Sequence, residues 1–411
     1  MVVVGCGAIG LSLAVAMAGA GRRVVGVDID AGRVAALNAG RLDLLDDGLA
    51  KPFSDALGDG RLSFQADLTP ADASRVYVAA VPTPADAETG WRRSMLDAAM
   101  ETVGRACHSG ELVCIRSTVP IGTTRAYGQG AAFDVACCPD RTVAGRGYLG
   151  QFETPHLIGA LTASAEQGAR ALFGTLGPVV TVSDPETAEA IKLFANIQRD
   201  VAFALANQFA LVCEAAGIDV DEVRVAGAAG YPRFSIPRPG PAGGPCLTKD
   251  VHLLQSSAAL DGVDISLLLA ARATNGGLAE VIAKRIEIQL AACARPAVAL
   301  LGLAFKGSPP TLDRRGGFAD DLVRVLSQRM PDLDLRAWDP AADPGSRALQ
   351  ESVAGADLIV LANDHPALAG AAALAARIAP EATIIDMCGV LGSGHAGSVQ
   401  RFGAAARRRP R

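Results

Sequence analysis

The sequence has little of several residue types, and each shortage excludes a class of protein. Aromatic residues make up 4% of the 411 residues, and the net charge is only −5. No strongly basic surface of the kind that binds nucleic acid is therefore expected. No apolar run approaches the ~20 residues that a membrane-spanning helix requires. A strand begins at Val2 without a charged leader, so we expect no signal peptide, no membrane partner and no nucleic-acid partner.

Cysteine, histidine and lysine are also informative by their distribution. The nine cysteines form no CxxC pair, are odd in number and lie mostly in apolar runs, which favours reduced thiols in the cytoplasm over disulfides. The five histidines are scattered, so no metal site is expected. Only five of the 38 basic residues are lysine. A lysine inside a motif is therefore of interest, because its compact charge and adaptable pKa cannot be replaced by arginine.

At 411 residues the chain is expected to form two or three domains, and the first carries a dinucleotide fingerprint. An apolar strand, Val2–Val4, leads into a GxGxxG turn, and a second strand, Arg23–Val27, ends in an aspartate. This spacing predicts glycines at the pyrophosphate and a carboxylate on the ribose. The candidate cofactor residues are Gly5, Gly7, Ala8, Ile9, Gly10 and Asp28.

The carboxylate of Asp28 favours NAD over NADP, because it would repel a 2′-phosphate. Arg22, Arg23 and Arg33 lie nearby in the sequence, and Arg33 is a further candidate to contact the cofactor. The preference for NAD therefore depends on which of these charges dominates at the ribose.

Further strands are expected at Arg75–Val81, Glu111–Ile115 and Phe133–Cys137, with helices between them, as in an open parallel sheet. Ligands of such sheets bind beyond the carboxyl ends of the strands. Thr83 and Thr118, in the loops after the first two strands, are therefore expected to face the cofactor. Ordinary turn chemistry is the alternative, and it is preferred for Ser117, Thr123 and Thr124. The third strand leads to Asp140 and Arg141 and to a glycine-rich loop that either carries a polar ligand or is a surface excursion.

The middle of the chain is predicted to be helical. An apolar-periodic stretch from Pro185 to Gly217 predicts one long helix, with Asp184 as its N-cap. Lys192 and Asn196 are four residues apart and so share a face. A lysine on a helix is usually solvated, but apolar neighbours surround this one. A second helical stretch, Ile265–Gln289, follows, and the apolar content of both predicts packing against a second subunit.

Between these helical stretches lies a glycine- and proline-rich segment that ends in Cys246, followed by Lys249 and Asp250. We expect a helix from Leu247 to Leu260, which would place Cys246 near its N-terminus, where the dipole and a lysine favour the thiolate. A packed small side chain is the alternative, and this segment alone does not decide between them.

After Pro296 an α/β pattern restarts, with strands expected at Val298–Leu303, Asp334–Trp338, Leu358–Ala362 and Thr383–Asp386, and a helix at Asp320–Leu326. The loop from Ser308 to Gly317 is proline-rich and doubly basic, and suits either phosphate oxygens or solvent. The predicted fold is α/β, with two doubly wound Rossmann-like domains joined by an all-helical segment. The expected divisions are 1–183, 184–290 and 291–400, with a disordered basic tail over 401–411.

Taken together, these segments resemble the nucleotide-sugar 6-dehydrogenases, the family of the UDP-glucose, GDP-mannose and UDP-N-acetylmannosamine dehydrogenases. The resemblance runs from Gly5 to Leu391. The motifs occur in the family's order: GxGxxG with Asp28, Val81–Pro84, Ser117–Thr124, Lys192 with Asn196, Gly243–Cys246 with Lys249 and Asp250, Phe305–Gly307, Asp313 with Arg315, and Trp338–Pro340.

The resemblance implies an NAD-dependent oxidoreductase that converts the C6 alcohol of a UDP-sugar to the carboxylate of a uronic acid for polysaccharide biosynthesis. Two NAD are used and the aldehyde is not released. Cys246 would form a thiohemiacetal and then a thioester, which water hydrolyses. Lys192 and Asn196 would stabilise the oxyanions, and Asp250, with Thr118, would activate the water.

The same resemblance assigns the ligand contacts and a homodimer formed through the central helices. The residues expected at NAD, besides the fingerprint, are Arg33, Thr83, Thr118, Lys249 and Arg315. The residues expected at the substrate are Asp140, Arg141, Lys192, Asn196, Arg233, Gly243 and Lys306.

The sequence departs from the family pattern at several points. Asp140-Arg141 resembles the Glu-Arg of the N-acetylated-sugar branch, although with a shorter acid, whereas Pro245 stands where that branch often has histidine. Cys388 occupies a position where the family commonly has a substrate-binding arginine, so that contact is either missing or supplied elsewhere, with Arg314 as a candidate. We expect a UDP-2-acetamido hexose, such as UDP-N-acetylmannosamine or UDP-N-acetylglucosamine, as substrate. The alternatives are a UDP-glucose enzyme of a specialised route and a catalytically silent NAD-binding protein.

Overall fold

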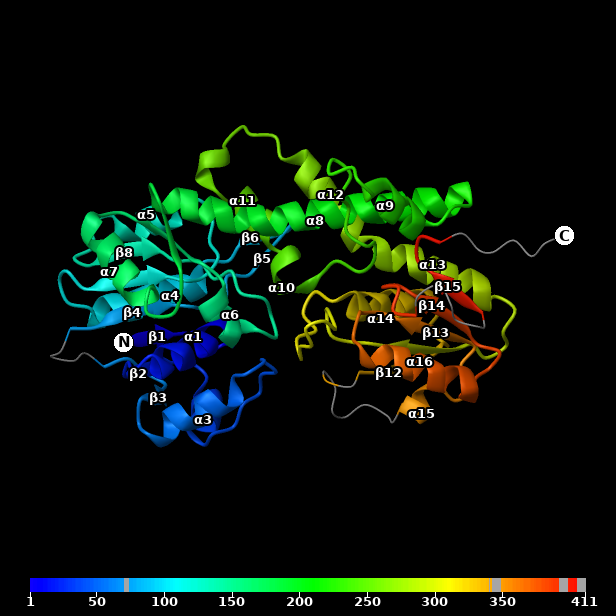
Figure 1. Cartoon of the computed structure of the whole chain (residues 1–411), viewed down its shortest axis with the longest axis horizontal. Helices are drawn as coiled ribbons and strands as arrows, with labels where there is room; N and C mark the ends of the chain where they lie inside the picture. The colour runs from blue at the N-terminus through cyan, green and yellow to red at the C-terminus, as the bar shows by residue number, and fades with distance from the viewer. Residues whose placement is uncertain (70–73, 340, 342–348, 392–397, 405–411) are drawn as a thin grey trace. The chain divides into compact units, whose positions relative to one another are not determined.

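The computed structural model describes residues 1–69, 74–339, 341, 349–391 and 398–404, and it divides the chain into two compact units (Figure 1). Unit 1 contains Met1–Asn196 and Lys249–Asp264, and unit 2 contains Ile197–Thr248 and the chain from Ile265 onward. The helical segment that we expected as a separate part is shared between the units.

The long helix α8 (Pro185–Ala216) explains this sharing, because its successive parts pack in different cores. Ala188 packs with Cys137 and Leu157 of unit 1. Ala210 and Cys213, six to seven turns further along, belong to the core of unit 2. The predicted helix from 185 to 217 is thus confirmed, but it does not belong to one domain.

Unit 1 is built on an eight-stranded sheet with the order β10-β9-β8-β7-β4-β1-β2-β3. All of its neighbouring strands are parallel except β8 and β9, which are antiparallel. The strands are β1 (Val2–Val4), β2 (Val24–Val27), β3 (Leu62–Gln65), β4 (Val76–Ala79), β7 (Leu112–Ile115), β8 (Asp134–Cys137), β9 (His156–Ala160) and β10 (Val179–Val182); β5 (Ala85–Asp86) and β6 (Gly90–Trp91) form a separate hairpin.

Helices cover both faces of this sheet, because its strands are apolar at successive positions. Val3 and Val78 face one core, with α1 and α7, whereas Val2, Val4 and Tyr77 face the other, with α4. The helices of unit 1 besides α8 are α1 (Ala8–Gly19), α2 (Ala31–Asn38), α3 (Ala50–Gly58), α4 (Ser94–Ala106), α5 (Thr123–Gly128), α6 (Gly147–Glu153), α7 (Ala163–Phe173), α11 (Asp250–Gln255) and the 3₁₀ turn η1 (Ala258–Leu260).

Unit 2 has a five-stranded, all-parallel sheet in the order β12-β11-β13-β14-β15, also covered on both faces. Its strands are β11 (Ala297–Leu301), β12 (Asp334–Trp338), β13 (Leu358–Leu361), β14 (Thr383–Asp386) and β15 (Val399–Arg401). Its helices besides α8 are α9 (Val220–Ala228), α10 (Gly244–Leu247), α12 (Ser266–Gly276), α13 (Leu278–Leu290), α14 (Phe318–Arg329), α15 (Leu349–Val353) and α16 (Ala367–Ile378). The prediction of two doubly wound α/β sheets is confirmed.

Several elements differ from the predictions. Strands β3, β9, β10 and β15 were not anticipated, and the helix expected over 265–289 is two helices that meet at Gly277. The disordered tail expected from 401 is wrong at its start, because Arg401 ends β15 and Phe402 packs in the core of unit 2. Residues 405–411 lie outside the described residues.

Within the described residues, no single helix has the length and apolar composition of a membrane span. Helices α8 and α9 meet those criteria only as a pair, and that pair is bent by 118°.

Candidate functional site

The predicted dinucleotide loop lies between β1 and α1, where the strand order reverses next to β4. Gly5 has a φ of +92°, a conformation that favours glycine. The carboxylate of Asp28, at the end of β2, accepts hydrogen bonds from the backbone N–H groups of Cys6 (2.8 Å) and Asp30 (3.0 Å). The acid therefore lies directly against the glycine turn, as the fingerprint requires.

Arg33, the residue that left the NADP alternative open, already has partners. Its Nε donates to the carbonyl oxygen of Cys6 at 2.8 Å, and its Nη1 forms an ion pair with Asp43 at 2.6 Å. The Asp43 carboxylate therefore offsets the charge of this guanidinium.

The structure brings five predicted site residues of unit 1 into one hydrogen-bonded group, which we call the Asp250 cluster: Thr83, Thr118, Asn196, Lys249 and Asp250. The Asp250 carboxylate accepts from Asn196 Nδ2 at 2.6 Å and from Lys249 Nζ at 2.8 Å. Lys249 Nζ also lies 3.4 Å from Thr83 Oγ1, which donates to the carbonyl oxygen of Thr118 at 2.7 Å.

This cluster is buried around its carboxylate. The Asp250 side chain is only 1% exposed, and that of Lys249 is 19% exposed. An ionised carboxylate in such a place must be paired and hydrogen-bonded, and here a lysine and an amide supply both. Lys249, which we expected at the cofactor phosphates, contacts Thr83 and Asp250 inside this cluster.

Lys192 lies one turn before Asn196 on α8 and is largely buried. Its charge acts on Asp140. Burial by itself would raise the pKa of Asp140, but the charges of Arg116 and Lys192 hold it below the ordinary value. A buried ammonium beside a carboxylate is suited to stabilise negative charge on a bound ligand as well.

Asp140, which we expected to contact the substrate, forms an ion pair and hydrogen bonds within unit 1. Its carboxylate forms an ion pair with Arg116 at 2.7 Å and accepts from the hydroxyl of Thr142 at 2.8 Å. Arg116 also donates to Gln151 at 3.0 Å, and its side chain is 1% exposed. Arg141, the neighbour of Asp140, is exposed. The sequence analysis did not single out Arg116, although it directly precedes the Ser117–Thr124 motif.

Glu189 is a second residue that the sequence analysis missed. It lies on α8, one turn before Lys192, and is 1% exposed. Its carboxylate accepts from the N–H groups of Gly122 (2.6 Å) and Thr124 (2.7 Å). It therefore fixes the loop that carries Thr118 to the helix that carries Lys192. The sequence offers one signal for this role, because Glu189 is an acidic residue within a mostly apolar stretch of the predicted helix.

In unit 2, Cys246 is the third residue of the one-turn helix α10. The single helix expected over 247–260 is wrong, because the chain turns at Thr248 and Lys249 before α11 begins at Asp250. Cys246 thus lies inside a short turn and not at the N-terminus of a long helix, so the dipole argument for its thiolate is weakened.

A cation does lie near the thiol. The pKa of Arg315 is raised mainly by its hydrogen bond to Asp313 and further by the charge of Cys246. A guanidinium close to a cysteine favours the thiolate over the thiol. Arg315 donates to Asp313 at 2.6 Å and 2.9 Å, and its side chain is 71% exposed.

Cys246 also differs from the other cysteines in its exposure. All nine lie in described parts of the chain, and Cys246 alone is exposed. Burial raises the pKa of the thiols of Cys6 and Cys107 to about 12. Of the nine, Cys246 therefore has the access that a nucleophile needs.

The other predicted substrate residues of unit 2 lie in loops. Lys306 follows β11 and lies over the Phe305 ring, with Nζ 5.8 Å from the ring centroid. Burial lowers the pKa of Lys306, an effect that Asp364 opposes and Arg199, another residue missed in the sequence, reinforces. Arg233 is exposed in the segment between α9 and α10.

Gly243 and Gly244 pack where side chains do not fit. The backbone N–H of Gly244 donates to the carbonyl oxygen of Gly316 at 2.9 Å. A Cβ on Gly243 would collide with that carbonyl oxygen, and one on Gly244 would collide with the Phe305 ring. The thiol segment is thus held against the loop after β11, at the carboxyl end of the sheet, where ligands of such folds bind.

Arg238 lies beside Cys388. Nη1 of Arg238 donates to the carbonyl oxygens of Cys388 (3.2 Å) and Gly389 (2.8 Å), whereas Arg314 forms an ion pair with Asp320.

The fold and the site define a class: an oxidoreductase with a nucleotide-binding Rossmann domain and a second doubly wound domain. The chain belongs to the UDP-glucose/GDP-mannose dehydrogenase family: residues 1–177 match the model of its NAD-binding domain and residues 186–276 that of its central domain. The protein is accordingly an NAD-dependent nucleotide-sugar dehydrogenase, and the sequence-based predictions of the family and of NAD are confirmed.

Relatives and solved structures agree. The chain is 32% identical to the UDP-N-acetyl-D-mannosamine dehydrogenase of Pyrococcus horikoshii, over 89% of each protein. It is 30% identical to the NDP-N-acetyl-D-galactosaminuronic acid dehydrogenase of Ralstonia nicotianae, over 88% of this chain and 90% of that one. The solved structure of the Pyrococcus horikoshii UDP-D-ManNAc dehydrogenase, 29% identical, aligns with a TM-score of 0.87 over 98% of this chain and 99% of that one.

Proposed function

We propose that this protein oxidises the C6 alcohol of a UDP-sugar to the carboxylate in two successive oxidations, with Cys246 as a covalent nucleophile. The observation that carries the proposal is that one thiol is exposed whereas the other eight are buried or only partly exposed. Cys246 is the only exposed cysteine of the nine, and its charge interacts with that of Arg315. Four residues further along the chain, Asp250 is a buried carboxylate held by an amide and an ammonium.

Bound NAD would accept a hydride from C6 in each oxidation, and the fingerprint loop with Asp28 fits such a dinucleotide. The chain's own residues handle the carbon between these steps. The Cys246 thiolate adds to the aldehyde carbon, giving a thiohemiacetal whose oxygen carries negative charge. After the second oxidation the C6–S bond is that of a thioester. Water then attacks, the C–S bond breaks, and the carboxylate and the thiol are released.

Lys192 and Asn196 are the proposed donors to the oxygen that becomes negative. The Asn196 amide has two N–H donors, and one is used on Asp250. Asp250 is the proposed acceptor of the proton from the attacking water, with Thr118 positioning that water. We further propose Lys249 and Arg315 for the NAD phosphates, with Thr83 and Arg33 at the cofactor, and Asp140, Arg141, Arg233, Gly243 and Lys306 for the nucleotide sugar.

A UDP-2-acetamido hexose is the proposed substrate class. The supporting observations are the names of the relatives, which act on N-acetylated sugars, and the Asp140-Arg141 pair. UDP-glucose is the second candidate, because the chain also aligns, at 25% identity and a TM-score of 0.84, with a UDP-glucose dehydrogenase from Pyrobaculum islandicum. Comparing kcat/KM for UDP-N-acetylmannosamine, UDP-N-acetylglucosamine and UDP-glucose decides between them.

We also propose a homodimer formed through the central helices. Leu205, Phe209 and Val212 are exposed on α8 at a spacing that places them on one face. Exposed apolar faces of this kind are typical of subunit interfaces. Light scattering at micromolar concentration should give twice the monomer mass, and a fully active monomer would refute the proposal.

The covalent mechanism is tested by Cys246→Ala. The wild-type enzyme should form two NADH per sugar acid, and the variant should form almost no acid, because the aldehyde has no thiol to capture it. Cys293→Ala, which removes a partly exposed thiol from the same unit, is the matched control and should behave as wild type. Two NADH per sugar at a near-normal rate in Cys246→Ala would refute the mechanism.

A further inference from the structure

The segment that leads to Cys246 is held by buried side chains to which no role has yet been given. Asn207 of α8, 2% exposed, pairs with both peptide groups of Gly240. Its Nδ2 donates to the Gly240 carbonyl oxygen at 3.0 Å, and its Oδ1 accepts from the Gly240 N–H at 2.8 Å. The Asn207 side chain therefore makes the two hydrogen bonds to Gly240 that the backbone of a neighbouring strand would make.

A second attachment lies two residues closer to the thiol. Arg272 of α12 donates through Nη2 to the carbonyl oxygen of Ala242 at 3.1 Å and through Nη1 to Asp200 at 2.8 Å. The side chains of Arg272 and Asp200 are only 11% and 4% exposed. Because each charge is buried, each needs the other, and the guanidinium has little freedom to leave Ala242.

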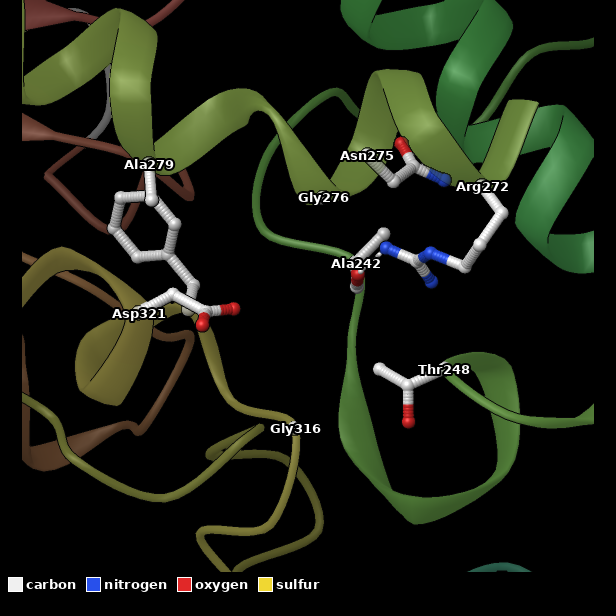
Figure 2. Close-up of a pocket in the computed structure, with 9 residues that line it drawn as sticks. Ala242, Thr248, Arg272, Asn275, Gly276, Ala279, Gly316 and Asp321 are labelled. Atoms are coloured by element: carbon white, nitrogen blue, oxygen red, sulfur yellow. Dashed lines mark hydrogen bonds between the residues drawn. The ribbon is translucent and has the colours of Figure 1, made fainter. Parts of the chain in front are cut away.

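Asn275 joins the two attachments. Its Nδ2 donates to the carboxylate and to the backbone oxygen of Asp200, both at 2.8 Å, and its Oδ1 accepts from Asn207 at 3.0 Å. Asp200, Asn207, Arg272 and Asn275, here called the loop clamp, thus form one connected network that begins at Gly240 and ends at Ala242. Figure 2 shows the Arg272 side chain reaching toward Ala242, with Asn275 further along the same helix.

One side of this segment lies beside a cavity. Ala242 and Thr248, which flank Cys246 in the sequence, line a cavity of about 90 Å³ together with Arg272, Asn275 and Gly316. A backbone beside a cavity lacks van der Waals partners on that side. Its position there depends on the hydrogen bonds of the loop clamp and on the contact of Gly244 with Gly316.

We propose that the loop clamp is a positioning device that sets the Cys246 thiol for capture of the aldehyde. This inference rests on the proposed covalent function of Cys246. The clamp binds the backbone of Gly240 and Ala242, so it acts through the backbone of residues 240–242. A loosened clamp impairs the second oxidation and leaves the first largely intact, because only the second uses the thiol. Misplacement of a reacting group by ~1 Å can cost about 10²-fold in rate.

The test is Asn207→Ser, which removes both hydrogen bonds to Gly240. The probe is UDP-N-acetylmannosamine with NAD, in the presence of hydroxylamine to trap released aldehyde as an oxime. We expect the first NADH at a rate within a few-fold of wild type, NADH per sugar falling from two toward one, and oxime appearing. Alkylation of Cys246 by iodoacetamide, followed by mass spectrometry, should also change in rate, which a general loss of stability would not cause below the melting temperature.

Asn38→Ser is the matched control, because Asn38 makes the same two-point pairing with Phe64 in unit 1. It should keep two NADH per sugar. A wild-type ratio and alkylation rate in Asn207→Ser, or an equal loss of both oxidations, would overturn the proposal. If Asn207→Ser does not fold, Arg272→Lys decides, since lysine keeps the charge opposite Asp200 but cannot also donate to Ala242 as the two-armed guanidinium does. Failure of both variants to fold would show a purely structural role. Failure of the covalent function is seen separately, as two NADH per sugar in Cys246→Ala.

Discussion

His156 should make unit 1 lose stability in mild acid. This histidine is the first residue of β9 and is 3% exposed. One ring nitrogen, Nε2, lies 2.8 Å from the carbonyl oxygen of Gln151, and the ring packs 5.0 Å from the Phe173 centroid. Burial, reinforced by the charge of Arg116, lowers the pKa of His156 from 6.5 to about 4. The folded protein therefore keeps the imidazole neutral where the unfolded chain protonates it.

The sign and size of the effect follow from this difference. A histidine whose pKa is lower in the folded protein does not change the free energy of unfolding above pH 6.5, because it is neutral in both states. Below that pH the unfolded chain binds a proton that the folded protein does not, so the free energy of unfolding falls. Each pH unit between 6.5 and about 4 removes about 1.4 kcal/mol from the free energy of unfolding. Between pH 7 and pH 5 the loss from this one residue is therefore about 2 kcal/mol.

The assay is urea unfolding at pH 7 and pH 5 for wild type and for His156→Gln, which stays neutral at both. Loss of the ring contact should destabilise the variant at both pH values. The difference between the two pH values should nevertheless shrink by about 2 kcal/mol relative to wild type. An equal pH dependence in wild type and His156→Gln would refute the reasoning.

Three further predictions concern the site. Lys192→Ala should lower kcat by about 10²–10³, the loss that follows removal of one oxyanion donor, and Lys192→Arg should not restore it, because the fork is bulkier; steady-state kinetics measure both. The ratio of kcat/KM should favour NAD over NADP, because Asp28 repels a 2′-phosphate and Asp43 already pairs with Arg33, and equal values would contradict this. Glu189→Gln should lower the free energy of unfolding by about 1–3 kcal/mol in urea, since one of two buried N–H groups loses its acceptor, whereas an unchanged value would remove Glu189 as the anchor of that loop.

Part of this protein could be predicted from local sequence alone. The fingerprint loop, Asp28 and the helix from 185 to 216 depend on neighbours within a few turns of the chain, and the structure has them as predicted. The pairing of Lys192 with Asn196 on one face follows from helix geometry. The family follows from such motifs in order, and the comparisons confirm it.

Other features required the tertiary structure, because their partners lie far apart in the sequence. Asp250 meets Asn196 across 54 residues, and Asp140 meets Arg116 across 24 residues. The break between Cys246 and Asp250 also escaped prediction, since residues 247–260 favour a continuous helix.

The loop clamp shows the same limit most clearly. Asn207 and Asn275 are ordinary helix residues in the sequence, and they become a clamp only when the two helices and Gly240 meet. A buried amide or carboxylate must find a hydrogen-bond partner, but the sequence does not say which one. Local pattern therefore determined the elements and the kind of chemistry in this protein. Long-range packing decided which polar groups form hydrogen bonds and ion pairs with each other, and which thiol stays exposed.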